Sequence, residues 1–257
     1  MITHLLLYFT TTVPSAIYLL FIRFSWPHAL LHAAINGWYV GTYTLMMHQH
    51  IHMRGVLTKS KLWTRVFDAV FPYILDPLMG HTWNSYFYHH VKHHHVEGNG
   101  PDDLSSTIRY QRDEISDFLQ YVGRFYFLVW LDLPLYFMRK GRYVTGAKAA
   151  FWEYASYAMY YALWKYAPGG GRATFMTLLA PFLVLRVMLM VGNWGQHAFV
   201  DEVEPESDYR SSITLVDVAV SYFPSPFPSF VFPSLPSPSF PFPSPFPSVL
   251  SRWMDGY

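Results

Sequence analysis

The stretch HALLHAAINGWYVGTYTLMMHQHIHMRG, residues 28–55, joins a long apolar run to a group of closely spaced histidines. Its first part, His28–Met47, has the length of a membrane span, since a helix needs about 20 apolar residues to cross a bilayer. His48 and His52 then follow four residues apart, which places both rings on one face of a helix and His50 roughly opposite. The stretch therefore predicts a membrane helix that ends in candidate metal ligands.

The composition also indicates a membrane protein. Of 257 residues, 52% are hydrophobic and only 14% are charged, against roughly 25% charged in an ordinary soluble domain. A net charge of +1 gives no case for nucleic acid as the main partner. The absence of cysteine excludes a disulfide framework, a cysteine-ligated zinc or iron–sulfur centre, and a thiol nucleophile.

Four apolar runs approach the length that a helix needs to cross a bilayer. They are Leu5–Ile22, His28–Met47, Lys148–Ala167 and Ala173–Val191. Two further runs, Leu62–Gly80 and Phe118–Met138, are expected in or on the membrane surface, and the second carries Arg124 and Asp132. The first run lacks the basic start and the small-residue cleavage site of a signal peptide, so we expect it to stay in the protein.

Basic residues gather in two loops, 54–65 and 139–148, with four Lys or Arg in each. Residues 167–172, APGGGR, are short and nearly uncharged by comparison. Because Lys and Arg concentrate in cytosolic loops, the two basic loops are predicted to face the cytosol and the Gly-rich turn the opposite side. The sequence thus predicts an all-α integral membrane bundle, with about four transmembrane helices in two hairpins plus interfacial helices.

The segment YHHVKHHHVEGNGPDD holds five histidines within seven residues. His90 and His94 lie four residues apart, with His95 adjacent. His89 and His93 form an equivalent pair on a neighbouring helix face, so the spacing alone leaves the register open. Imidazole nitrogens suit iron, zinc, copper or nickel, and the ligand type does not choose among them.

A third group appears in GNWGQHAFVDE, where Asn193 and His197 are again four residues apart. A solvated histidine tract that binds metal only adventitiously is the alternative, but three histidine groups on one predicted face favour a built metal site. Asp102 and Asp103 follow a Gly-Pro turn and are expected to do no more than cap a helix.

The remaining histidines are expected to be structural. His4 and His81 stand alone in apolar surroundings, where a histidine is usually a hydrogen-bonded core or interface residue. His28 and His32 are spaced like the first pair, but they begin the second span on the side opposite the predicted site. We therefore do not expect them to bind metal.

The pattern resembles the integral-membrane fatty acid desaturases and related hydroxylases, a family marked by three histidine boxes. HQHIH matches the first box, H-x3/4-H, at His48 and His52. NWGQH resembles an additional family motif, N-x3-H, in which the histidine joins the metal site and the asparagine can hold a metal-bound water. The resemblance implies these roles for His197 and Asn193, and it covers residues 28 to about 217.

The second box, H-x2/3-HH, is matched by HVKHHH in two ways. One match uses His90, His94 and His95, and the alternative uses His90, His93 and His94. The first is preferred, because family members often have an asparagine four residues after the paired histidines, and Asn99 stands there.

The resemblance implies a diiron centre on the cytosolic face of the bundle, with two non-haem iron ions held by histidines. The implied ligands are His48, His52, His90, His94, His95 and His197. Such a centre uses O2 and two electrons to remove hydrogens from an acyl chain, so the implied substrate is a membrane lipid or other acyl compound. The same boxes serve hydroxylases of acyl chains, sphingoid bases or carotenoids, and a catalytically dead scaffold is the alternative outside enzymes.

The resemblance also implies an electron donor and a location. The donor would be cytochrome b5-like or ferredoxin-like, and it would dock on basic residues. The candidates are Lys59, Lys61, Arg139, Lys140 and Arg142. The implied location is the endoplasmic reticulum or a plastid membrane, with the histidine boxes facing the cytosol or stroma.

The C-terminal residues form a low-complexity segment. From Phe223 to Leu250, every residue except Val231 and Val249 is Ser, Pro, Phe or Leu. Because proline recurs too often for helix or sheet, we expect a disordered tail over residues 218–257, after a membrane domain over residues 1–217. A polyproline-II ligand is one interpretation. All four residue types have codons made only of pyrimidines, so an unspliced or inserted pyrimidine-rich repeat is the simpler one.

No histidine follows His197, so the third box of the resembled family is absent from the sequence. The ending WMDGY, residues 253–257, resembles the family's lead into that box. We therefore expect the chain as given to be an incomplete desaturase-like enzyme, a fragment in which the tract interrupts the approach to the third box.

Overall fold

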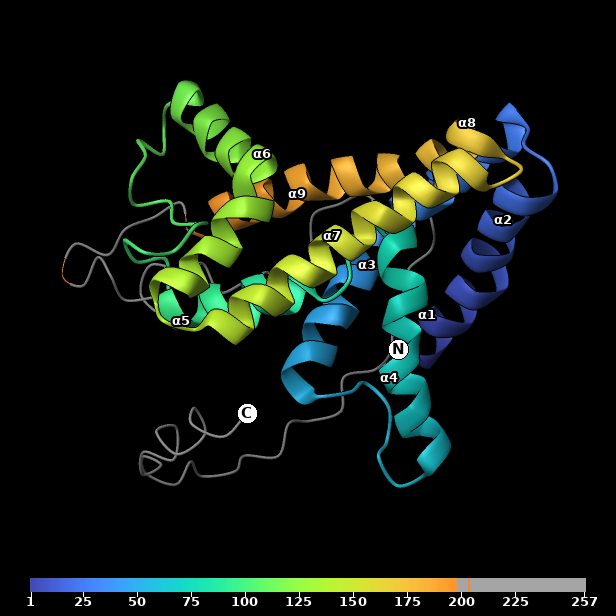
Figure 1. The fold of residues 1–257 in the computed structure, drawn as a ribbon, viewed down its shortest axis with the longest axis horizontal. Coiled ribbons are helices and arrows are strands. Elements are labelled where there is room, and N and C mark those ends of the chain that lie inside the picture. The colour runs from blue at the N-terminus through green and yellow to red at the C-terminus, as the bar shows by residue number, and fades with distance from the viewer. Residues whose placement is uncertain (198–202, 204–257) are drawn as a thin grey trace, which may run out of the picture. The chain divides into compact units, whose positions relative to one another are not determined.

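The computed structural model describes residues 1–197 and Val203. All regular structure in these residues is helical, in seven continuous helices (Figure 1). They are Ile2–Ile22 (with α1, Ile2–Leu7, and α2, Val13–Ile17), α3 (Trp26–Met53), α4 (Leu62–Leu78), residues 87–97 (with α5, His95–Glu97), α6 (Ile115–Arg139), α7 (Tyr143–Tyr166) and Gly170–Gln196 (with α8, Gly170–Thr174, and α9, Ala180–Gln196). The predicted all-α class is confirmed, whereas the predicted disordered tail lies outside the described residues.

The first helix and α3 are joined by buried polar side chains. Ser15 Oγ lies 2.8 Å from His28 Nε2 and 2.9 Å from His32 Nδ1. Asn36 Nδ2 lies 3.0 Å from His32 Nε2, and Asn36 Oδ1 accepts a hydrogen bond from Thr12 Oγ1 at 2.8 Å. His28 and His32 therefore hydrogen-bond between helices, as predicted for structural histidines.

A close approach follows the end of α4. Gly80 has a φ of +89°, and a Cβ at this position would lie 2.5 Å from the carbonyl oxygen of Pro181 at the start of α9. Glycine alone fits both this backbone conformation and this contact. The next residue, His81, is buried, with its Nε2 3.3 Å from Thr44 Oγ1, as expected for a core histidine. The turn after α4 is thereby held against α9.

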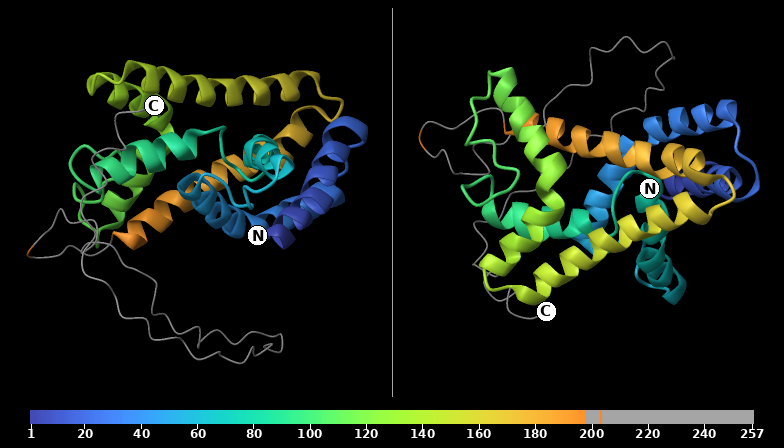
Figure 2. Two further views of the ribbon diagram at one scale, coloured as in Figure 1. Left: turned by 90° about the horizontal axis from the view of Figure 1, so that it is seen from below. Right: turned by 45° about the horizontal axis from the view of Figure 1, so that its top comes forward.

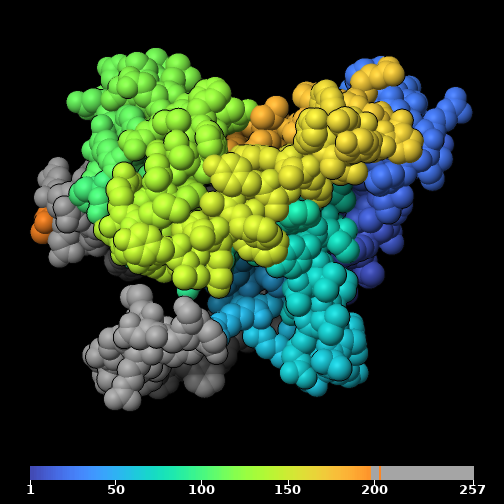
Figure 3. Space-filling model, in the orientation of Figure 1, coloured from blue at the N-terminus to red at the C-terminus, as the bar shows by residue number. Residues whose placement is uncertain are grey.

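The second half of the fold is built on α6 and α7, which pack against each other and cover the upper part of the front in Figure 3, above α4. α6 also packs on α9, and the shared core includes Leu133, Phe137, Ala149 and Met190. α7 runs to the turn at α8, where the chain reverses into α9 (Figure 2). This arrangement brings the end of α9 back to the histidine-rich residues 87–97.

Two of the helices, Ile2–Ile22 and Gly170–Gln196, are long and apolar enough to cross a membrane. They coincide with the first and fourth predicted spans. The second and third predicted spans form α3 and α7, which carry exposed large apolar side chains such as Trp38 (83% exposed) and Tyr161 (63% exposed). Exposed apolar surface of this kind marks contact with lipid or protein. That α3 and α7 cross the membrane, and that α4 and α6 lie at its surface, stay predictions.

Candidate metal centre

The second histidine group lies on a π-helix, the segment η3 (Phe87–His94), which runs directly into α5. A π-helix bonds each residue to the fifth one along, and such turns are rare and often found at functional sites. The ring of His90 accordingly lies 5.7 Å from that of His94 and 4.4 Å from that of His95, between centroids. The ring of His90 is therefore closer to the residue five positions along, His95, than to the residue four positions along, His94.

The first and second histidine groups meet between α3 and η3. Ring centroids lie 4.6 Å apart for His48 and His52, 4.7 Å for His48 and His90, and 4.9 Å for His52 and His95. The Nε2 atoms of His90 and His95 are 3.0 Å apart. One ring nitrogen from each of His48, His52 and His90 falls within 4.8 Å of the others, close enough for one ion to bind all three.

The third group joins this cluster through His94. The ring of His94 lies 5.6 Å from that of His197, which is buried at the end of α9, and 5.7 Å from that of His95. All six predicted ligands therefore form one continuous set of neighbouring rings. His50, by contrast, packs its ring on Phe71 of α4, 5.1 Å away, as predicted for a histidine outside the cluster.

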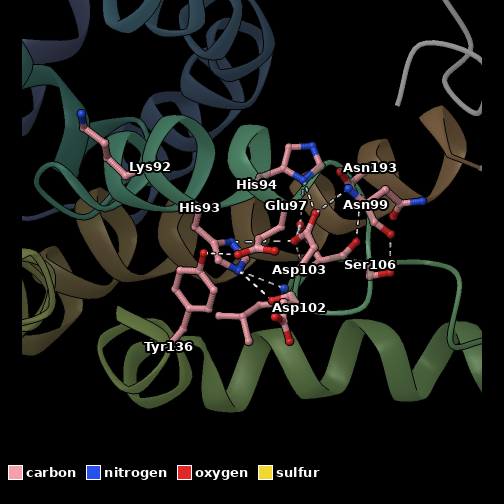
Figure 4. A network of polar contacts seen from close by, with 12 residues as sticks. Lys92, His93, His94, Glu97, Asn99, Asp102, Asp103, Ser106, Tyr136 and Asn193 are labelled. Carbon is pink, nitrogen blue, oxygen red and sulfur yellow. Dashed lines mark hydrogen bonds and ion pairs between the residues drawn. The ribbon is translucent and has the colours of Figure 1, made fainter. Parts of the chain in front are cut away.

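A buried carboxylate orients His94, and sequence reasoning missed it. Asp103 is fully buried, and its Oδ2 lies 2.6 Å from His94 Nδ1 (Figure 4). The same carboxylate accepts hydrogen bonds from the backbone N–H groups of Asn99 (3.1 Å) and Ser105 (2.8 Å). A carboxylate in this place fixes the orientation of the ring, as carboxylates do for metal-binding histidines.

The expectation that Asp102 and Asp103 cap a helix is wrong. The next helix after them begins only at Ile115, because residues 98–114 form turns that fold back onto η3. Asp102 lies at the surface, and its Oδ2 is 2.7 Å from Lys140 Nζ. The clue in the sequence was the Gly-rich GNGP turn, which returns the chain to the histidines that precede it.

Tyr86 is a second residue that the sequence did not single out. Its ring stacks on His90 at 5.0 Å, and its hydroxyl lies 3.4 Å from His48 Nδ1. Burial raises the pKa of Tyr86 to about 12, so the phenol stays neutral. It supports two rings of the cluster from one side, which leaves the Nε2 atom of His48 for a metal ion.

His89 and His93 lie on the other side of η3. His93 is fully buried, its ring packs on Tyr136 at 4.4 Å, and its Nε2 contacts the backbone carbonyl of Asp102 (3.3 Å) and the N–H of Leu104 (3.2 Å). Ligand atoms of His89, His93 and Asp103 nevertheless lie within 4.8 Å of one another, so the alternative second box with His93 stays open. Nδ1 of His93 and Nε2 of His89 are buried without a hydrogen-bond partner among the described residues.

The surroundings favour the neutral form of three of the imidazoles. Burial, followed by the neighbouring imidazoles, lowers the pKa of His48, His89 and His90. Burial disfavours the Asp103 carboxylate, but its hydrogen bond with His94 and the nearby histidines outweigh burial and lower the pKa of Asp103. Neutral imidazole and ionised carboxylate are the forms that bind and orient a metal ion.

Asn193 has contacts that the sequence did not anticipate. Its Nδ2 donates hydrogen bonds to the Ser105 carbonyl oxygen at 2.9 Å and to the Tyr121 hydroxyl at 2.7 Å. The amide nitrogen thus ties α9 to α6 and to the turn after Asp103. The predicted role of Asn193 in holding a metal-bound water stays a prediction.

Two of the residues predicted to dock an electron donor, Lys140 and Arg142, make contacts within the fold. Lys140 Nζ lies 2.7 Å from Asp102 Oδ2 and 3.2 Å from Glu97 Oε1. Arg142 packs its guanidinium over the ring of Phe137 at the end of α6. Part of the positive charge in the loop 139–148 is therefore balanced within the fold.

Comparison with known proteins identifies the family. No curated protein and no solved structure matches the chain. The family model described as fatty acid desaturase matches residues 24–232, a range that contains all three histidine groups and the Asp103 turn. The resemblance seen in the histidine boxes is thus confirmed over most of the sequence: this chain belongs to the fatty acid desaturase family.

Proposed function

We propose that this chain is a desaturase-like membrane oxidoreductase in which O2 and a histidine-ligated diiron centre introduce a double bond into an acyl chain, although the sequence given lacks the third histidine box. Membership of the family implies an acyl substrate and an electron donor in general terms. The observation that carries the finer proposal is the continuous set of six imidazoles between α3, η3 and α9.

The donor set fits iron. Imidazole nitrogen suits iron(II), and the rings are mutually close and partly held by Asp103 and Tyr86. The residues proposed to hold the two iron ions are His48, His52, His90, His94, His95 and His197. Breaking an unactivated C–H bond with O2 is chemistry that iron supplies when bound, because no protein side chain offers it.

The other residues position and shield the reaction. A cavity of about 60 Å³ opens beside His89, with an apolar wall formed by Phe125, Val129 and Leu133 of α6. A cavity of this size has room for only a short piece of a hydrocarbon chain, which these side chains would contact beside His89. Asp103 keeps His94 in one tautomer by accepting its Nδ1–H, so the ring does not need to reorient during turnover.

The proposed topology has four crossings, with the basic loops and the histidines on one side. The chain has no cysteine, so single cysteines can be introduced at Lys59, Arg139 and Pro168 as unique labelling sites. A membrane-impermeant maleimide is expected to label the first two only from the cytosolic or stromal side, and Pro168→Cys only from the opposite side. Labelling of Arg139→Cys from the Pro168 side would make α6 a crossing helix, and the proposed shared metal site would be lost.

The proposed location is the endoplasmic reticulum or a plastid membrane. Electrons would come from a cytochrome b5-like or ferredoxin-like donor. Among the predicted docking residues, Arg139 is exposed, and Lys59 is exposed with its Nζ donating a hydrogen bond to the Met53 carbonyl oxygen. With Lys140 and Arg142 engaged in the fold, the donor site proposed here centres on Lys59, Lys61 and Arg139.

The function is tested by metal content and product analysis on the full chain, expressed in a host membrane that contains a suitable electron donor. We expect iron bound to the purified protein and host acyl chains that have lost two hydrogen atoms, detected by mass spectrometry. Products that gain an oxygen atom would show a hydroxylase, and zinc in place of iron would indicate a hydrolase. Protein without bound metal and without new products would contradict the proposal and favour a catalytically dead scaffold.

A further inference from the structure

The cavity beside His89 has a second wall that is polar and deeply buried. Opposite the apolar side chains of α6 it is lined by Thr82, Glu153 of α7 and Arg186 of α9. Glu153 is 4% exposed and Arg186 9% exposed, and they form an ion pair through Oε1 and Nη2. Removing two charges from water costs free energy that their mutual attraction seldom returns in full. A cavity that binds only a plain hydrocarbon chain would gain no binding free energy from such an ion pair.

The hydrogen bonds within this wall use both oxygens of Glu153 but only one nitrogen of Arg186. Both Glu153 oxygens are engaged, Oε2 by Thr82 Oγ1 at 2.5 Å and Oε1 by Tyr157 and Arg186. The hydrogen bonds of Arg186 among the described residues all use Nη2. Its Nε and Nη1 groups have no hydrogen-bond partner among the described residues, and Arg186 lines the same cavity as His89, whose Nε2 is buried without a partner in the described part of the chain.

The charges of Glu153 and Arg186 limit which chemical groups the cavity can bind. Glu153 balances Arg186, so the cavity offers hydrogen-bond donors without net positive charge. A carboxylate or phosphate would be buried next to Glu153 without a compensating cation, which is costly. An uncharged oxygen atom can accept from the guanidinium and meet the imidazole of His89, while the carbon chain beside it lies on Phe125 and Val129.

We propose that this cavity recognises an uncharged oxygen of the lipid substrate, a hydroxyl or a carbonyl, carried near the carbon that reacts. The proposal rests on the proposed function and narrows its substrate class: the preferred lipid carries an oxygen function within its chain instead of being a plain hydrocarbon chain. Arg186 and His89 bind that oxygen, and Glu153 holds Arg186 in place. A purely structural role for the ion pair, joining α7 to α9, is the alternative.

Photolabelling of the purified full-length protein tests the proposal. Two chains of equal length carry the same diazirine and differ in one mid-chain substituent, a hydroxyl in one and a methyl group in the other. A third carries a ketone carbonyl there. Peptide mass spectrometry measures labelling of the cavity residues Phe125, Val129 and Leu133. We expect the hydroxyl or the carbonyl chain to label them about tenfold better than the methyl chain, since hydrogen bonds to a charged group are strong.

Variants separate recognition from structure. Glu153→Met/Arg186→Met removes both charges together, and the preference for oxygen is expected to fall to near unity. The matched control is Arg124→Met/Asp132→Met, which removes an ion pair of α6 that does not line the cavity and should keep the preference. His89→Leu provides a second test if the double variant does not fold, and it too should lose most of the preference.

The outcomes are distinct from those that test the function. Labelling needs neither iron nor turnover, so a protein that lacks oxygenase activity still reports on the cavity. Equal labelling by all three chains in the unaltered protein would overturn the proposal. So would a preference that persists in both the double variant and His89→Leu, because the ion pair would then be structural only. The ratio between the hydroxyl and carbonyl chains tells which of the two oxygen functions the cavity prefers.

Discussion

A His90→Ala variant is expected to lose iron affinity by at least about 100-fold and to show no desaturation. Loss of a group that merely supports a metal ligand typically costs 10- to 100-fold, and His90 is proposed as a ligand. Its ring is also the centre of the cluster, next to His48, His52 and His95. Iron content by elemental mass spectrometry and acyl products by mass spectrometry measure the two effects.

The matched control for this variant is His50→Ala. It removes an imidazole from the turn of α3 that carries His48 and His52, but the His50 ring packs on Phe71 and not on the cluster. Iron binding should therefore stay close to that of the unaltered protein. Equal iron loss in His50→Ala and His90→Ala would show that the iron is held by the histidine-rich surface in general.

Asp103→Asn is expected to lower iron affinity by about 10- to 100-fold, the usual cost of losing a group that orients a metal-binding histidine. The amide keeps the shape of the side chain but lacks the charge that holds His94 Nδ1–H, and its NH2 group would face the backbone N–H of Asn99 or Ser105. Titration of iron(II) against a competing chelator measures the change.

Asp102→Asn is the control, because it makes the same substitution one residue earlier. The Asp102 side chain is 62% exposed and pairs only with Lys140 in the described part of the chain, so its loss should leave iron affinity within about threefold, as for most surface pairs. If Asp102→Asn weakened iron binding as much as Asp103→Asn, the effect would come from disturbing the turn and not from orienting His94.

The sequence allowed the histidine groups to be predicted because each relies on local geometry. His48 and His52 lie on one face of an ordinary α-helix, where a spacing of four fixes the relation of the rings. The end of an apolar run also predicts where such residues meet the membrane surface. Helix content and the pairing of His48 with His52 follow from such short-range rules.

The register of the second group could not be predicted in the same way. Counting by four treats residues 87–94 as an α-helix, yet they form a π-helix in which His90 is closest to His95. A π-helix depends on how neighbouring helices pack, so the spacing of residues does not predict it. The contacts of His93 with Asp102 and Leu104 are tertiary as well, and the choice between His93 and His95 as a ligand stays a prediction.

Contacts between residues far apart in the sequence could not be predicted either, because they also depend on how the helices pack. Glu153 and Arg186 lie on different helices, and within the sequence each looks like an isolated charge in an apolar run. Only the packing of α7 beside α9 makes them a pair. Asp103 was placed in the wrong role because a carboxylate after a Gly-Pro turn resembles a helix cap until the turn is seen to fold back on His94.

The polar contacts between the first helix and α3 bear on how the protein enters the membrane during its synthesis. Taken separately, one helix would carry Thr12 and Ser15 into hydrocarbon, and the other would carry His28, His32 and Asn36, which is the more costly set. When the two helices pack together, these side chains form hydrogen bonds with one another. In the proposed topology, the unit that can leave the translocon at low cost is therefore the pair of helices, and α3 depends on a partner that was synthesised before it.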